Sequence, residues 1–406
     1  MVDGKRSHSP ARPVRVLHLM TGPSSEIGGI ASVIRDIQYM AEARGSFSAE
    51  TYWQGDHQTN SHWKLRIGHR LNRAFSKFQR SPYRFSGFDR HAIPPGTSEQ
   101  YDVLHLHRPE FQRAVAYRSH PRGAVIVHAH SINGFTGGCV LESECPRLKH
   151  GCRKCPVVVN SAAVLPPLGL RQRIERFRRM TPVIISNSHY TQRCIEQSPV
   201  IEFARSSVII TPAIDTSVFR RASGPRRASS VRRIGFVAAS LSDENKQFDH
   251  FVDASRALKS MFDVELHAAG HASTEFQKAF PDVHFRGPVR GADLRIFYQS
   301  LDALVVSSRS ESFGMISVES QFCGTPVVVY ATGGLVETIL VGVTGRLARA
   351  GDIQDLSNAI RDILSDKQIS SKFDSPCVEA FLNSFTLDTI ARRYEELYHD
   401  LADNPF

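Results

Sequence analysis

The 406-residue sequence contains no uninterrupted apolar stretch of the ~18 residues that a membrane-spanning helix needs. The start of the chain also lacks the apolar segment of a secretory signal peptide. The composition, 41% hydrophobic and 22% charged residues, is that of a soluble globular protein. We therefore expect a cytoplasmic protein, and the length fits two domains of ordinary size.

Acidic residues are scarce in the first half of the chain. Residues 1–215 contain 29 lysines and arginines against 16 acids, whereas the remaining residues contain 21 against 24. This asymmetry indicates that the first half meets an anionic partner, such as a membrane surface, a lipid phosphate or nucleic acid. A basic surface without a dedicated partner is the alternative.

Residues 61–90 combine Trp, Leu, Ile and Phe side chains with eight basic residues and one acid, which predicts a basic amphipathic helix. Such a helix can contact anionic head groups at the inner face of the cell membrane, or it can pack its apolar stripe on the domain core. Nucleic acid is the weakest of the three interpretations, and we expect no nucleic-acid partner.

Short, β-branched apolar runs alternate with helical segments from Val14 onward, which predicts α/β domains with parallel, doubly wound sheets. Residues 220–233 are mostly small, polar or basic and lack a hydrophobic period, as is typical of a linker. The predicted division is a disordered tail (1–12), a first domain (13–215), a linker (216–232), a second domain (233–385) and a final amphipathic helix (386–406).

The predicted strands share apolar, β-branched composition and are Val14–Met20, Tyr101–His107, Ala124–His130, Val183–Ser186, Ile234–Ala238, Val264–Ala269, Val283–Phe285, Ala303–Ser308 and Pro326–Tyr330. The predicted helices with clear periodicity or boundary signals are Ile30–Arg44, Leu170–Met180, Phe248–Phe262, Met315–Phe322 and Leu387–Leu401. The strongly basic helix at 170–180 is expected to present a solvated face.

The most informative stretch runs from residue 301 to residue 345. Its first strand ends in polar residues, and the backbone N–H groups of Phe313, Gly314 and Met315 open the following helix, where they favour an anion. Glu311 and Glu319 lie eight residues apart and are expected to face one crevice. Two carboxylates beside an anion site suit a sugar attached to a diphosphate, although solvated helix-end acids would give the same spacing.

The residues E-S-F-G-M-I-S-V-E, followed by C-G-T-P-V-V and G-G-L-V-E-T-I, resemble the donor-binding signature of retaining family 4 glycosyltransferases. The resemblance implies a GT-B fold, in which two Rossmann-like domains face a central cleft. It implies that Glu311 holds sugar hydroxyls and Glu319 the ribose of the nucleotide. It further implies an acceptor-side first domain, a nucleotide-sugar-binding second domain, and a final helix that crosses back to the first domain. A strand followed by a turn at Val208–Asp215 is implied only by this family resemblance.

Two more segments are similar to the family's donor-phosphate contacts. Gly28 and Gly29 correspond to a glycine pair that faces the diphosphate before the first helix, and Lys246 corresponds to a lysine that grips it. Gln247 follows where glycine is usual, and Leu241 replaces a common arginine. An ordinary exposed loop lysine is the alternative for Lys246.

His130 ends one of two predicted strands that finish in histidines. Together with the F-T-G-G-C run at residues 135–139, it resembles a cysteine-bearing subgroup of family 4 enzymes from bacterial surface-polysaccharide synthesis, which reads H-D-x-W-x-F-T-G-G-C. There the histidine lies near the donor sugar and phosphate. The chain departs from the subgroup at Ser131 and Asn133, which replace Asp and Trp.

Four of the seven cysteines, Cys139, Cys145, Cys152 and Cys155, lie within seventeen residues. Four thiolates at this spacing can hold a tetrahedral structural Zn²⁺, which leaves no open coordination position for catalysis. Metal-free cysteines, an iron–sulfur cluster and a pair of disulfides are the alternatives. A reducing cytosol disfavours disulfides.

The expected function is therefore retaining transfer of a sugar, without a catalytic metal or other cofactor, from a UDP- or GDP-sugar to a lipid-linked or oligosaccharide acceptor. The expected catalytic residues are His130 and Glu311, and the expected donor contacts are Gly28, Gly29, Lys246, Phe313, Gly314, Met315 and Glu319. The alternatives are a non-catalytic binding protein of the same fold at an anionic membrane surface, and a GT-B phosphorylase or epimerase.

Overall fold

The computed structural model describes residues 12–21, 29–53, 99–108, 111–116, 123–139, 145–156, 158, 164–223 and 230–404. Gly28, nearly all of the predicted tail and the basic segment 61–90 lie outside the described residues. None of the helices in these ranges combines the length and apolar composition that crossing a bilayer requires.

The first domain is built on a six-stranded sheet in which all neighbouring strands are parallel. Its order is β2-β1-β3-β4-β5-β6. The strands are β1 (Val14–Met20), β2 (Phe47–Trp53), β3 (Val103–Leu106), β4 (Ala124–Ala129), β5 (Val183–Ser186) and β6 (Ser206–Ile209). The central strands β3, β4 and β5 are buried at every residue because both faces of the sheet are covered.

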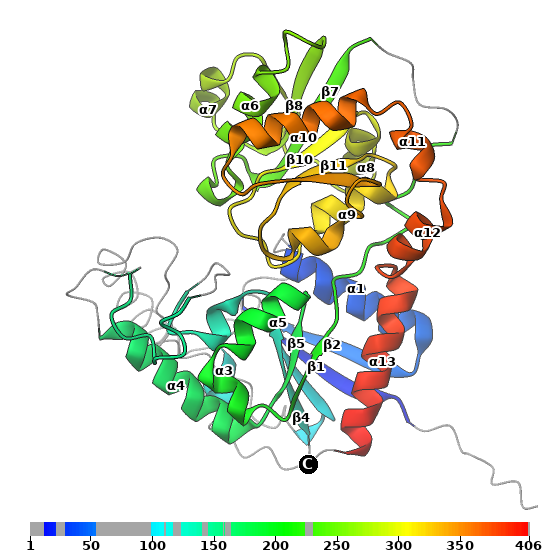
Figure 1. Ribbon diagram of the computed structural model, residues 1–406. Coiled ribbons are helices and arrows are strands. Elements are labelled where there is room, and N and C mark those ends of the chain that lie inside the picture. Colours follow the sequence, from blue (N-terminus) through cyan, green and yellow to red (C-terminus); the bar gives the residue numbers. More distant parts are fainter. Residues whose placement is uncertain are drawn as a thin grey trace, which may run out of the picture.

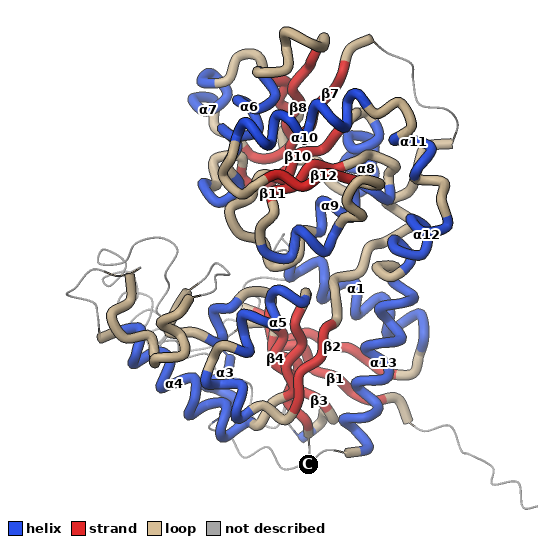
Figure 2. The backbone as a smooth tube through the Cα atoms, viewed as in Figure 1, coloured by secondary structure: helices blue, strands red, loops and turns tan. Residues whose placement is uncertain are grey.

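Helices cover the two faces of this sheet (Figures 1 and 2). One face packs against α1 and α13, and the other against α3 and α4, each through its own apolar cluster. The α-helices of the first domain are α1 (Gly29–Arg44), α3 (Gln112–Ala116), α4 (Leu165–Met180) and α5 (His189–Glu196). Two short 3₁₀ helices follow β4 and α5, at η4 (Ile132–Phe135) and η6 (Pro199–Phe203).

The second domain repeats this architecture, with an all-parallel sheet in the order β12-β11-β10-β7-β8-β9. Its strands are β7 (Arg232–Ser240), β8 (Val264–His271), β9 (Val283–Phe285), β10 (Ala303–Val306), β11 (Val327–Tyr330) and β12 (Gly345–Ala348). Its helical segments are η7 (Glu244–Lys246), α6 (Phe248–Arg256), α7 (Thr274–Ala279), α8 (Gly291–Gln299), α9 (Met315–Phe322), η8 (Gly333–Thr338), α10 (Ile353–Ser365), α11 (Ile369–Lys372) and α12 (Pro376–Asn383). The predicted pair of doubly wound α/β domains is confirmed.

The chain passes between the domains twice, and the two passages lie side by side, since the Ile214 N–H donates to the Phe385 carbonyl at 2.8 Å. After the second passage, α13 (Leu387–Asp403) packs along the first domain, where Tyr394 and Tyr398 are fully buried (Figure 1). Arg44 at the end of α1 donates to Glu395 at 2.7 Å, so α13 joins α1 in covering one face of the first sheet.

Each sheet has one point where the strand order reverses, and candidate site residues follow the strands at both points. In the first sheet β1 has β2 on one side and β3 on the other, and in the second β7 lies between β8 and β10. Ligands of open α/β sheets bind outside the carboxyl ends of strands at such points. Gly29 follows β1, Lys246 follows β7 and Glu311 follows β10.

Sequence patterns did not predict two edge strands or the burial of two arginines. β2 and β12 contain polar or charged residues among the apolar ones, so neither shows a clean strand period. On α4, the expected solvated basic face is wrong in part, because Arg173 and Arg176 are buried. Arg173 donates to the Thr136 carbonyl at 2.9 Å and to Gln112 at 3.1 Å.

Two glycines bring α4 against the loop that follows η4. A Cβ atom at Gly169 would lie 2.5 Å from the Gly137 carbonyl oxygen, and one at Gly137 would lie 2.4 Å from the Pro166 carbonyl oxygen. Both obstacles are backbone atoms, which cannot rotate away.

Gly169→Ala should therefore lower the free energy of unfolding by ~1–3 kcal/mol, the usual cost of overpacking, although alanine ordinarily favours a helix over glycine. Denaturant unfolding of both proteins measures this difference. The matched control is Arg171→Ala at an exposed position of the same helix, which should change the value by less than ~0.5 kcal/mol. A stabilised Gly169→Ala protein would contradict the close approach.

Candidate functional site

A cavity of about 330 Å³ lies between the two domains. Its size is within the range of small-molecule sites. Both domains contribute to its wall: the first through Gly29, Ile30, Val33, His130, Asn187 and Pro212, and the second through Val237, Ala238, Ala239, Lys246 and residues 311–316.

Lys246 and Glu311 form an ion pair on the second-domain wall. Glu311 also accepts a hydrogen bond from the Ser308 hydroxyl at 3.0 Å, so its carboxylate is held from two sides. Both side chains are partly exposed and line the cavity. The sequence placed these two residues in one site, and the structure brings them into direct contact.

The loops that carry this pair are tied together by Asn245. Its side chain donates to the Ser310 carbonyl at 2.9 Å and accepts from the Ser310 N–H at 3.2 Å, while its own carbonyl accepts from Arg309. Gln247 follows with φ of 50°, a left-handed conformation that favours glycine. This backbone conformation explains why glycine is usual here in the family that the sequence resembles. Gln247 adopts the same conformation at some cost in conformational energy.

The amino terminus of α9 opens onto the same cavity, as the sequence predicted for Phe313, Gly314 and Met315. Gly314 adopts φ of 103°, and a Cβ atom there would lie 2.4 Å from the Leu335 side chain. The first N–H groups of a helix have no partner within it, so this end can accept an anion.

The opposite wall carries the start of α1. A Cβ atom at Gly29 would lie 3.8 Å from the Met315 sulfur, so the amino termini of α1 and α9 approach each other from different domains. Two helix termini therefore border one cavity, and both favour negative charge there.

His130 lines the cavity at the end of β4 and belongs to a cluster of five histidines from β1, β3 and β4. Its Nε2 lies 2.9 Å from Nδ1 of His107, and Nε2 of His107 lies 2.8 Å from Nδ1 of His18. A second branch joins His128 to His105 at 3.1 Å and His105 to the Tyr398 hydroxyl at 2.9 Å. The sequence predicted His130 at the site but not this network, because no sequence pattern showed that the strand of His18, far earlier in the chain, pairs with β3.

Burial lowers the pKa of His18 and of His130 to about 3 and lowers the pKa values of the other three well below their usual range. The nitrogens of His18, His105 and His107 lie within 4.8 Å of one another, as do those of His107, His128 and His130, a spacing compatible with metal ligands. Their shortest separations of 2.8–3.1 Å are hydrogen-bond distances, and neutral rings satisfy one another without an ion.

Glu319 does not lie where the sequence placed it. The structure does not bring it into the cavity beside Glu311, because it lies on the part of α9 that faces α8, where its Oε2 accepts a hydrogen bond from the Tyr298 hydroxyl at 2.9 Å. Burial raises the pKa of Glu319 to about 7. Oε1 has no hydrogen-bond partner among the described residues.

Contacts that hold the two domains together border the cavity and were not predicted. The Glu337 carboxylate accepts from the backbone N–H groups of His189 at 2.8 Å and Tyr190 at 2.7 Å, so it caps α5 from the other domain. Ser188 donates to the Ser312 carbonyl at 2.6 Å. The G-G-L-V-E-T-I run contained Glu337, but nothing in the sequence indicated its partner.

The four clustered cysteines line a separate small cavity in the first domain, together with residues of η4, its following loop and α4. They do not reach the interdomain cavity.

Residues 231–366 match the family model described as "Glycosyl transferases group 1". Among curated relatives, the chain is 32% identical over 145 residues to a D-inositol 3-phosphate glycosyltransferase of Geodermatophilus obscurus, covering 36% of this chain and 31% of that protein. It is 29% identical over 272 residues to the enzyme of the same name from Mycobacterium bovis, covering 59% and 54%. The matches thus span about a third to a half of these relatives.

Solved structures align over almost the whole chain. The Anabaena protein HepE in complex with UDP and glucose has a TM-score of 0.65 at 18% identity, over 96% of this chain and all of that one. Sucrose-phosphate synthase from Thermosynechococcus elongatus has a TM-score of 0.67 at 16% identity, over 96% and 99%. At these identities the likeness concerns the fold, and the predicted GT-B fold is confirmed.

The histidine cluster predicts a stability that falls with acidity. Below about pH 6.5 the unfolded chain protonates these five histidines while the folded chain keeps them neutral. Asp36 and Glu319, whose pKa values burial raises to about 7, act in the opposite sense but are only two groups. We expect the free energy of unfolding to fall between pH 6.5 and 4.5 by at least ~1.4 kcal/mol per pH unit, the slope of one net proton.

Denaturant titrations across this pH range measure the slope. His18→Leu should make it shallower by up to one proton, whereas the same change at the exposed His271 should not. A pH-independent free energy of unfolding would show that the rings already carry charge in the folded state.

Proposed function

We propose that this protein is a glycosyltransferase that moves a sugar, with retention of its anomeric configuration and without a catalytic metal, from a nucleotide-sugar donor to a hydroxyl acceptor. The observation that carries the proposal is the interdomain cavity in which the Lys246–Glu311 pair, the amino termini of α1 and α9, and His130 meet. The family match of residues 231–366, which include the pair, supports it.

The donor diphosphate would lie between the two helix termini and Lys246. The backbone N–H groups of the two helix termini are fixed before the ligand arrives, so they stabilise the charge that develops on the leaving phosphate without reorganisation. An incoming diphosphate competes with Glu311 for the Lys246 ammonium, which frees the carboxylate to accept hydrogen bonds from sugar hydroxyls. The ribose is proposed to extend beyond the lining of this cavity to Oε1 of Glu319, whose Oε2 is held by Tyr298.

The transfer would break the bond between the anomeric carbon and the phosphate oxygen, with the electron pair leaving on that oxygen. The acceptor oxygen forms the new bond from the same face, and its proton passes to the departing phosphate. His130, which lines the first-domain wall, would orient the sugar beside the reacting carbon. No carboxylate nucleophile enters this sequence of events.

An anionic acceptor suits the first half of the chain, with its 29 basic against 16 acidic residues. A lipid-linked phosphate or oligosaccharide of surface-polysaccharide synthesis is the proposed acceptor, bound at the inner face of the membrane. Relatives named for inositol 3-phosphate make a soluble phosphorylated acceptor the second candidate. Both candidate acceptors are anionic, and the basic residues of the first half of the chain would neutralise their negative charge.

Glu311→Ala should lower the transfer rate by ~10²-fold or more, the usual effect of losing a positioned catalytic contact. Product formation from a nucleotide sugar measures the effect. Glu379→Ala, the same change at an exposed position of α12, is the matched control and should leave the rate unchanged. Near-normal turnover by Glu311→Ala would contradict the catalytic role proposed for Glu311.

Nucleotide-sugar binding should appear as thermal stabilisation. A ligand at 100 times its Kd adds ~2.7 kcal/mol to the free energy of unfolding. In a panel of UDP- and GDP-sugars we expect one donor to give this shift. UDP-sugars are the first candidates because the aligned HepE structure holds UDP. Lys246→Ala should abolish the shift, and the exposed Lys278→Ala should keep it.

The same panel separates the alternatives. A donor that stabilises the protein but yields no product with any acceptor would favour a non-catalytic binding protein. Release of a sugar phosphate on addition of inorganic phosphate would indicate a phosphorylase, and an isomerised donor an epimerase. Stabilisation by none of the nucleotide sugars would contradict the donor site itself.

A further inference from the structure

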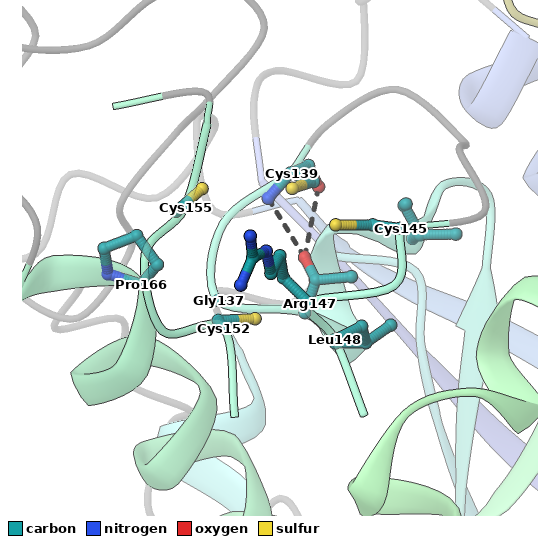
Figure 3. Close-up of a pocket in the computed structure, with 10 residues that line it drawn as sticks. Gly137, Cys139, Cys145, Arg147, Leu148, Cys152, Cys155 and Pro166 are labelled. Carbon is teal, nitrogen blue, oxygen red and sulfur yellow. Dashed lines mark hydrogen bonds between the residues drawn. The ribbon is translucent and has the colours of Figure 1, made fainter. Parts of the chain in front are cut away.

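The small cavity of the first domain is lined by all four clustered cysteines, Cys139, Cys145, Cys152 and Cys155 (Figure 3). Its volume of about 10 Å³ has room for one ion or one water-sized particle. None of the four forms a disulfide.

The segment 145–156 that carries three of these cysteines consists of turns, without a helix or a strand. Cys152 and Lys154 adopt φ values of 58° and 52°, although neither is a glycine. Such left-handed conformations at ordinary residues persist only where the surroundings fix them. Leu148 and Cys152 pack into the first-domain core, which is little apolar burial for a segment of this length.

The hydrogen bonds around the sulfurs suit thiolates. The Gly137 backbone N–H is directed at Cys152, and the Thr136 side chain is directed at Cys139. Arg147 lines the same cavity, and its side chain extends into the space between the cysteines in Figure 3. Hydrogen-bond donors beside the sulfurs orient and stabilise ligating thiolates.

We propose that Cys139, Cys145, Cys152 and Cys155 bind one Zn²⁺ as a structural site that fixes the turns of residues 145–156 to the loop after η4. Four thiolates complete the tetrahedral coordination of Zn²⁺ and leave no position open for a substrate. In the described residues no three of the sulfurs lie within 4.8 Å of one another, so the ion would draw these turns inward. The proposal does not depend on the proposed transferase activity.

The loop after η4 is a firm anchor for such a site. The Cys139 N–H donates to the Thr136 hydroxyl at 3.0 Å, and the Thr136 carbonyl accepts from the buried Arg173. Gly137 meets α4 through backbone contacts that exclude any side chain. Zinc would therefore attach an otherwise weakly packed segment to a part of the domain that is already rigid.

Elemental analysis of the full chain, purified with a thiol reductant and without chelator, tests the proposal. We expect about one zinc per chain, and X-ray absorption at the zinc edge should give four sulfur neighbours at ~2.3 Å. Cys152→Ser should lose most of the zinc. Cys377→Ser, the same change at an exposed cysteine of α12, should retain it.

Cys155→His keeps the test decisive if the serine variant fails to fold, because histidine is also a zinc ligand and should preserve the stoichiometry. Stoichiometric iron with visible absorbance would replace zinc by an iron–sulfur cluster and overturn the proposal. Metal-free protein, whether with free thiols or with disulfides between these cysteines, would overturn it as well. Each result is obtained without assaying sugar transfer, so it stands apart from the fate of the proposed function.

Discussion

The Lys246–Glu311 ion pair joins the loops after β7 and β10, two neighbouring strands at the point where the second sheet reverses its order. The pair can form because Asn245 ties the two loops by three hydrogen bonds and because Gln247 accepts a left-handed turn. The amino terminus of α9 follows directly after the loop that carries Glu311. The position of the first N–H groups of α9 therefore depends on the same loops. The groups that the second domain presents to the cavity are thus positioned by backbone geometry at the carboxyl ends of β7 and β10.

The first domain completes the cavity through contacts of a different kind. Glu337 and Ser312 of the second domain hold the start of α5, and the two interdomain passages are bound to each other at Ile214 and Phe385. These contacts are polar, which is typical of domains that move relative to each other.

Sequence patterns predicted most of the apolar strands, several of the periodic helices and the residues that sit in short motifs, but not the periodic helices α8 and α10. Val14–Met20 and Met315–Phe322 were predicted to the residue because strong boundary signals flank buried segments. Glu311 and His130 were predicted because each follows a strand at the edge where ligands bind, and Lys246 was predicted from the resemblance to family 4 glycosyltransferases. The orientation of Glu319 could not be predicted, since it depends on Tyr298, twenty-one residues earlier on another helix. The partner of Glu337 likewise lies in the other domain.

The chain of His18, His107 and His130 has a consequence for where protons reside. A neutral imidazole carries one N–H, so two successive hydrogen bonds between three such rings must point the same way. Nε2 of His18 is buried without a partner among the described residues. A lone pair is less costly to leave there than an N–H, which makes His18 the first donor and His130 the last acceptor. His130 then holds its proton on Nδ1. The tautomer of His18 on β1, at the other end of this chain of rings, therefore decides which nitrogen of His130 can donate a hydrogen bond.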